Sequence, residues 1–271
     1  MERADHLADA EALVRQIIEI RKRVSGQDHP QTLLAMSDLG RILNQEERAP
    51  EAEAVHRPTL AVQQRVLGPD HPNCVSTMDG LAMALRRQHK LDEAEKLCRR
   101  ALDISSRILG PEHPTTLMEM GNLALIFEWH KQYQDAERLQ RQVVAISRRT
   151  LRPDHFNTIV AMNHVAENLH LEGRDAESAA LFRETAEIQR RTLRPAHRYT
   201  LSTLYNLACV LATDHKSAEA LSVLRDVVGK GFAHADDLES DPDFKSLRGD
   251  ARFKAIIEEV KQRDAAAPKT K

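Results

Sequence analysis

The sequence predicts an all-α fold, a right-handed superhelical solenoid of five two-helix repeats. Three observations predict it: a short motif returns at a constant interval of 42 residues, apolar residues within each interval have helical spacing, and proline closes each interval. A fixed period of this length is typical of stacked supersecondary units. The motif is an acidic residue, histidine and proline, with variants in later copies. Its histidines are His29, His71, His113, His155 and His197.

The first expected element is an unpaired helix over residues 5–24, which forms a half-repeat. Ala10, Leu13 and Ile17 align with three second-helix columns, those of Ala52, Val55 and Thr59, so the matching first helix would lie before the chain's first residue. A half-repeat leaves an apolar stripe without an intramolecular partner. Self-association through this stripe is therefore one expectation.

Each full repeat then begins near its histidine with a first helix of about 15 residues. Ten and fourteen residues after the histidine stand apolar side chains that define one buried face: Leu39, Leu81, Leu123, Val165 and Leu207, and Leu43, Leu85, Phe127, Leu169 and Leu211. The residue eleven positions on is always glycine or alanine, which predicts close contact with a neighbouring helix.

A second helix of about 16 residues follows a short turn in each repeat. Its small inward column is Ala52, Ala94, Ala136, Ser178 and Ala220. Proline cannot continue a helix, so we expect it to end this helix at Pro69, Pro111, Pro153 and Pro195. Proline also suits the first turn of the next helix, at Pro30, Pro72 and Pro114. Pro58 lies inside a second helix, which predicts a kink and a less regular first repeat.

The 42-residue period stops after Gly231, so the array is expected to cover residues 1–229. Residues 230–263 are expected to form a helical cap, with Asp241 and Asp250 as N-caps. Phe253, Ile256 and Val260 would face the last repeat. Residues 264–271 are expected to form a disordered tail.

Composition excludes several classes of function. The 39 basic and 41 acidic residues give a formal charge of −2, which disfavours nucleic-acid and membrane partners. Arginines recur every 42 residues from Arg23 to Arg191, but acidic residues of the linkers could pair with them. No apolar run is long enough for a signal or a membrane span, and we expect a cytoplasmic protein.

Catalytic and metal-binding signatures are also missing from the sequence. Its three cysteines lack metal-ligand spacing, and no nucleotide-binding or hydrolase motif occurs. The repeated histidines belong to different repeats and are expected to be structural. We therefore predict no enzyme activity, no cofactor and no metal. An enzyme or metal protein that uses the histidines remains an alternative, which elemental analysis would decide.

The repeat resembles the 42-residue tetratricopeptide repeats of kinesin light chains and related bacterial arrays. The closest copy is HPTTLMEMGNLALIFEWHKQYQDAERLQRQVVAISRRTLRPDH, from His113 to His155. The resemblance covers roughly residues 5–229, and it implies a scaffold or adaptor that binds a peptide segment or partner helix in a concave groove. A regulatory or sensor region of a larger multidomain signalling protein is the alternative.

The resemblance also implies which residues face the groove. Family arrays hold asparagine eight or nine residues after the histidine, where the amide can bond a peptide backbone. Departures from this pattern make peptide capture by repeats 1 and 2 doubtful, and they are Asp38, Asp79, Gly80 and Gly121. The matching asparagines and the neighbouring apolar residues place the strongest part of the groove in repeats 2 to 5. Trp129 could anchor a partner or pack at the end of its helix. The expected groove residues are Met83, Arg87, Asn122, Leu125, Trp129, Asn163, Tyr205 and Asn206.

Overall fold

The computed structural model describes residues 2–152, 154–193 and 196–266, and every regular element in these ranges is a helix. Pro153, Pro195 and residues 267–271, which the sequence assigned to linkers and tail, lie outside the described residues. The chain forms two compact units, residues 1–132 and 133–271.

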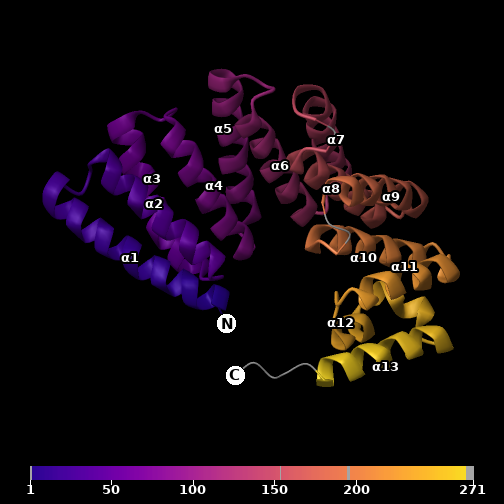
Figure 1. Cartoon of the computed structure of the whole chain (residues 1–271). Coiled ribbons are helices and arrows are strands. Elements are labelled where there is room, and N and C mark those ends of the chain that lie inside the picture. The colour runs from indigo at the N-terminus through magenta and orange to yellow at the C-terminus, as the bar shows by residue number, and fades with distance from the viewer. Residues whose placement is uncertain (1, 153, 194–195, 267–271) are drawn as a thin grey trace. The chain divides into compact units, whose positions relative to one another are not determined.

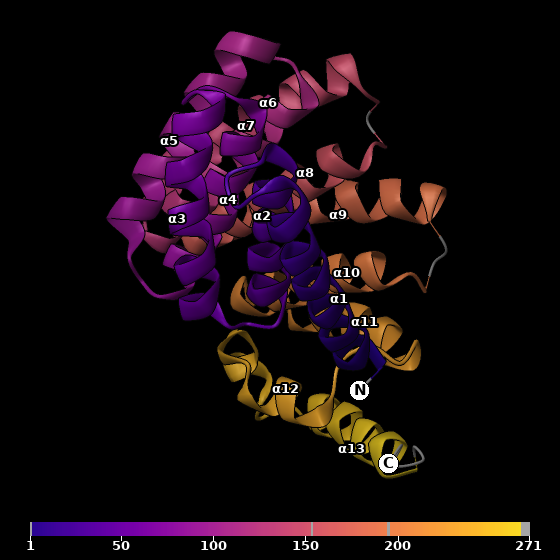
Figure 2. The same cartoon turned by 90° about the vertical axis from the view of Figure 1, so that its left-hand side faces the viewer.

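The first unit is a row of six helices in which each packs against the next (Figure 1). The helices are α1 (Glu2–Ser25), α2 (Pro30–Gln45), α3 (Ala49–Leu67), α4 (Pro72–Arg87), α5 (Leu91–Leu109) and α6 (Pro114–Trp129). The first helices of consecutive repeats also touch, α2 against α4 and α4 against α6. Figure 2 shows α2 between α1 and α4.

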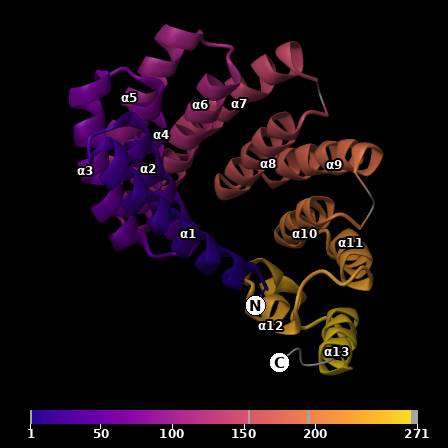
Figure 3. The same ribbon diagram turned by 60° about the vertical axis from the view of Figure 1, so that its left-hand side comes forward.

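The second unit continues the two-helix pattern and ends in the cap. Its elements are α7 (Tyr133–Thr150), α8 (Phe156–Leu171), α9 (Asp175–Thr192), α10 (Arg198–Thr213), α11 (Ser217–Gly229), α12 (Ala235–Ser240), the 3-10 helix η1 (Pro242–Leu247) and α13 (Ala251–Ala266). α13 lies beside α11 and α12 (Figure 3). The 3-10 helix η1 packs on α10. Phe253, Ile256, Ile257 and Val260 are buried in one core with residues of α10 and α11.

The repeated apolar columns form the core of both units. All ten residues of the two first-helix columns are at most 5% exposed, and the five small residues of the second-helix column are fully buried. Burial of each large apolar side chain contributes roughly 1.5–3 kcal/mol. The residues that recur every 42 positions are therefore the residues that form the core.

The five repeated histidines cap the first helix of each repeat. In each case Nδ1 accepts a hydrogen bond from the backbone N–H two residues on, at 3.1 to 3.3 Å. Pro30, Pro72 and Pro114 follow at the first helical position, where no N–H is needed. The structural interpretation of the motif is confirmed.

Replacement of a capping histidine should weaken its unit. His71→Ala leaves the N–H of Asn73 without its acceptor, and we expect a loss of about 1 kcal/mol of unfolding free energy. His71→Asn supplies another capping acceptor and should recover most of the loss. Urea unfolding followed by Trp129 fluorescence measures both. Equal stability of wild type and His71→Ala would contradict the capping role.

Second helices end at glycine in two of the linkers. Gly68 and Gly110 have φ values of 91° and 92°, which L side chains rarely adopt, and the following proline prevents the helix from resuming. α3 continues through Pro58 and, with 19 residues, is as long as α5. The kink at Pro58 and the lower regularity of the first repeat stay predictions. Packing on both neighbouring helices keeps α3 helical past the missing N–H.

The ends of the chain carry one expected feature and one correction. Leu13, Ile17, Ile20 and Val24 form an exposed stripe on α1, from 41% to 74% exposed, as the half-repeat predicts. The sequence predicted a disordered tail from residue 264 onward. This prediction is wrong for residues 264–266, because α13 continues to Ala266. Arg263 stabilises this last turn by donating to the carbonyls of Val228 and Ala233.

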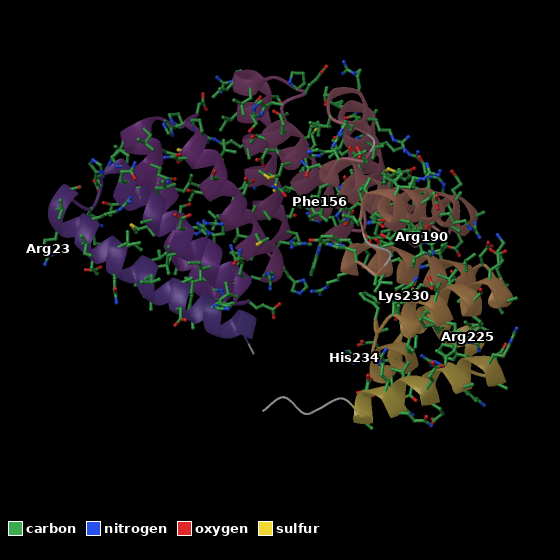
Figure 4. The ribbon with its side chains drawn as sticks, viewed as in Figure 1. Arg23, Phe156, Arg190, Arg225, Lys230 and His234 are labelled. Carbon is green, nitrogen blue, oxygen red and sulfur yellow. The ribbon has the colours of Figure 1, made fainter. Side chains whose placement is uncertain are left out.

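Two of the recurring arginines pair with linker acids, whereas Arg191 pairs with Glu187 of its own helix at 3.0 Å. Arg65 pairs with Asp28, and Arg107 pairs with Asp70 at 2.6 Å. Arg23 lies exposed near the end of α1, and Arg190 contacts Asp226 at 3.5 Å (Figure 4). Such exposed pairs contribute little stability, but each offsets the charge of its own arginine. Among the described residues, no helix is both long and apolar enough to cross a membrane.

Candidate functional site

The first unit contains a pocket of about 420 Å³, which lies on the face formed by the first helices of repeats 1, 2 and 3. α2, α4 and α6 supply most of its lining, and one residue each comes from α3 and α5. Leu34, Met83 and Met118 stand at its rim and are 38%, 43% and 51% exposed. Leu125 and Ile126 extend the apolar wall. The pocket thus combines exposed apolar side chains with a concave surface.

Two carboxyl groups and an amide meet beside this pocket. Asn122 Nδ2 lies 3.3 Å from Asp79 Oδ1 and 3.4 Å from Glu119 Oε2. Burial raises the pKa of Asp79, and burial together with the neighbouring Asp79 carboxyl raises the pKa of Glu119 to about 10. At pH 7 the pair therefore keeps at least one proton.

A buried histidine from the second helix of repeat 1 also lines the pocket. His56 is fully buried, and neither ring nitrogen has a hydrogen-bond partner among the described residues. Burial lowers its pKa to about 4, so the ring is neutral at pH 7. The absence of side chains at Gly40 and Gly80 makes room for the ring, because a Cβ on either glycine would lie within 2.5 Å of Nε2.

Asn44 completes the polar floor from α2. Its Nδ2 donates to the Gly80 carbonyl at 2.8 Å, while its Oδ1 is buried and has no partner among the described residues. Asn44 and His56 therefore both contact the segment of α4 that carries Asp79 and Gly80. Nearby, Ser37 and Thr77 share a buried hydrogen bond of 2.7 Å between α2 and α4.

An aromatic side chain, Trp129, contacts a lining residue of the pocket. The Trp129 ring is 5.4 Å from the Arg86 guanidinium carbon and 5.4 Å from the His89 ring centre, and it is 43% exposed. Arg86 itself lines the pocket. The contacts hold Trp129 in one orientation while leaving much of its surface available.

The structure brings three of the predicted groove residues into this pocket, namely Met83, Asn122 and Leu125. Trp129 connects to it through Arg86. Arg87 is absent from the pocket lining and contacts Glu47 at 3.4 Å. The pocket also reaches into repeat 1, where the departures from asparagine had predicted a weaker groove.

The other three predicted residues lie in the second unit and bond within it. Thr203 donates to Asn163 Oδ1 at 3.2 Å, and Asn206 donates to Glu167 Oε1 at 3.0 Å. Tyr205 donates to Asp241 Oδ2 at 2.8 Å. These groups link neighbouring elements, so a bound peptide backbone would have to share or replace their present bonds.

A cysteine and two aspartates also meet in the second unit. The ligand atoms of Cys209, Asp241 and Asp243 lie within 4.8 Å of one another. Asp241 is engaged already, because it accepts from the Tyr205 hydroxyl and caps η1 by accepting from the N–H of Asp243. Burial raises the pKa of the Cys209 thiol, which disfavours the thiolate that a metal requires. The cluster serves as a helix cap.

Sequence reasoning missed the polar floor of the pocket. Asp79 was noted only as a departure from asparagine, and His56, Asn44 and Glu119 were not singled out. One signal was available for His56, since its column is otherwise filled by Cys98, Gln140, Phe182 and Leu224, which predicts burial. Glycine at both Gly40 and Gly80 was the second signal.

The fold and the repeat define the class as a helical-repeat scaffold of two-helix units. Tetratricopeptide repeat models match residues 3–31, 39–95, 74–149, 118–185 and 157–228. The chain belongs to the tetratricopeptide repeat family. No curated protein sequence gives a significant match to it.

Solved structures indicate the kinesin-light-chain-like type of repeat. A crystal structure of nearly identical repeats, described as those of a Podosopora anserina kinesin light chain, is 28% identical, with a TM-score of 0.66 over 75% of this chain and 96% of that one. BtubC (BKLC) from P. vanneervenii shares the fold at 18% identity, with a TM-score of 0.63 over 96% of this chain and 91% of that one. The predicted resemblance is confirmed.

Proposed function

We propose that this protein-interaction scaffold binds a segment of a partner protein across α2, α4 and α6 of the first unit. The pocket with its exposed apolar rim is the observation that carries the proposal. Concave apolar surfaces with a few polar groups are the usual form of binding sites. The repeat family supports a protein partner in preference to a small substrate.

The rim suits a peptide side chain or one face of a helix. Met83 and Met118 are flexible and polarizable, so they can adapt to the partner. Trp129 is already held by Arg86 and His89, so little side-chain entropy is lost when a partner covers it. Asn122 contributes an amide between the apolar groups. Together these groups would provide affinity at the rim and selectivity in the pocket.

Two further surfaces remain predictions. Asn163, Tyr205 and Asn206 would extend binding to the second unit, provided that their present bonds rearrange. The exposed stripe of α1, from Leu13 to Val24, would support self-association. Neither is needed for the first-unit proposal.

The proposal predicts that truncation of the rim weakens peptide binding. A displayed random-peptide library is selected on the wild-type chain, and the selected peptides are measured against a Met83→Ala, Met118→Ala double variant. Loss of apolar contact should weaken binding about tenfold or more, roughly 1 kcal/mol per side chain. Ile108→Ala is the matched control, because Ile108 is 48% exposed on α5 and lies outside the pocket.

Two results would contradict this function. One is a library that yields no peptide specific for the chain. The other is a set of peptides that bind the double variant and the wild type equally, which would place the contact elsewhere.

A further inference from the structure

The floor of the first-unit pocket has more hydrogen-bond acceptors than donors. Asn44 uses its amide N–H on the Gly80 carbonyl and leaves Oδ1 unpartnered among the described residues. The neutral His56 ring has one acceptor nitrogen, and neither of its nitrogens has a partner there. Asp79 receives the long bond from Asn122 and shares a hydrogen bond with the Glu119 carboxyl group. Buried acceptors without donors are costly, so such a floor favours a ligand that brings donors.

In the described part of the chain, the floor of the pocket also has carboxyl groups without paired cations. On α2, Arg41 pairs with Asp38 at 3.0 Å. On α4, Arg86 lies over the Trp129 ring. Both cations of the pocket lining are therefore engaged at its rim. No lysine or arginine among the described residues forms an ion pair with Asp79 or Glu119, so the buried carboxyl pair has no cation of its own.

The walls above this floor are apolar. Leu34, Met83 and Met118 line the pocket at its rim, and Leu125 continues this apolar lining. A side chain that fits would have an apolar stem and a terminal group rich in donors. Lysine has this form, with four methylenes and an ammonium that carries three N–H donors. The acceptors come from separate helices, which suits three diverging donors better than the planar fork of arginine.

We propose that this pocket receives a lysine side chain of the bound partner segment, with its ammonium against Asp79 and Asn44 and its methylenes against Met83 and Leu125. This inference rests on the proposed function, because it names the chemistry that the partner segment presents to the same site. His56 and Asn122 form the remaining polar boundary. The proton retained by the carboxyl pair leaves to solvent when the ammonium replaces it.

Methionine methyl signals in NMR spectra test the inference directly. The chain has seven methionines; Met83 and Met118 line the pocket, whereas Met162 lies in the second unit. The probes are Nα-acetyl-lysine N-methylamide and its norleucine analogue, which keeps the stem and lacks the ammonium. We expect the lysine probe to shift the Met83 and Met118 signals, leave Met162 unchanged, and bind at least tenfold more tightly than the norleucine probe.

Two variants locate the charge that is responsible. Asp79→Asn should reduce lysine binding to the level of norleucine. Asp38→Asn is the matched control, because it removes a carboxylate that is already paired with Arg41. Equal binding of the lysine and norleucine probes by the wild type would overturn the inference without any variant. Stronger binding of the corresponding arginine probe would overturn the choice of lysine.

The peptide selection separates this inference from the function on which it rests. Selected peptides that bind across the rim but contain no enriched lysine would refute the lysine pocket and leave the scaffold function intact. Lysine-probe binding together with a library that yields no specific peptide would refute segment binding and retain the cation pocket.

Discussion

Glu119→Gln should stabilise the first unit by about 3 kcal/mol at pH 7, and by more at pH 8.5. Glu119 is fully buried beside Asp79, and its pKa rises from an ordinary 4.5 to about 10. Between these two pH values the unfolded chain has released a proton that the folded chain retains. The unfolding free energy therefore falls as pH rises, by about 1.4 kcal/mol per pH unit for one proton.

The glutamine variant removes this titration. Its amide can donate to Asp79, so the buried site stays hydrogen-bonded without a second carboxyl group. The difference in stability between variant and wild type should be small near pH 4.5 and grow with pH up to about 10. The buried carboxyl pair thus lowers the free energy of unfolding at neutral pH. Destabilising buried groups of this kind are often found at functional sites.

Urea unfolding at pH 5, 7 and 8.5, followed by Trp129 fluorescence, measures the effect. Trp129 is the only tryptophan and lies in α6, the helix that carries Glu119. Glu19→Gln on α1 is the control, because its side chain is 72% exposed, and it should leave the pH dependence unchanged. A Glu119→Gln variant that loses stability with pH as steeply as wild type would show that the buried pair is not responsible.

Gly80→Ala should destabilise the first unit by about 1–3 kcal/mol, a large effect for one added methyl group. The new Cβ would lie 2.4 Å from both Nε2 and Cε1 of His56. The ring cannot simply retreat, because Gly40 contacts it from α2 and the side chain is fully buried. A shift of α3 relative to α4 would be needed.

Gly121→Ala provides the matched control for this substitution. Gly121 also lies inside a first helix, one column away, and nothing stands within 4 Å of a Cβ built on it. Alanine should stabilise α6 by roughly 0.5–1 kcal/mol, because glycine is a poor helix former. His56→Ala combined with Gly80→Ala should remove the clash, and a double-mutant cycle would measure the coupling. Equal stability of the two glycine variants would contradict the close contact.

Local rules were sufficient for the helices and for much of the cap. The histidine–proline step predicts a helix start, because proline suits the first turn, and the following apolar columns predict the buried face. Asp241 and Asp250 cap the elements that follow them, as expected from their spacing to Pro242 and Ala251. At Pro58 the local rule predicts a kink, and α3 is helical on both sides of the proline.

The candidate site could be predicted only in part. Met83, Asn122 and Leu125 follow from the repeat, since a fixed column in a repeated helix points in a fixed direction. Their partners do not follow, because Asn44, His56, Asp79 and Glu119 come from four helices and only packing brings them together. Nor could the sequence show that Asn163 and Asn206 already bond to neighbouring groups.

The amino-acid order alone was enough to establish the family, the order of the repeat helices and the core columns, because these depend on contacts within one 42-residue period and on its repetition. The depth and chemistry of the first-unit pocket depend on departures from that period. Gly40, Gly80 and His56 are each ordinary in isolation. Only the approach of α2, α3 and α4 encloses the ring, buries the carboxyl pair and raises its pKa, because desolvation is a property of the packed helices and not of any one segment.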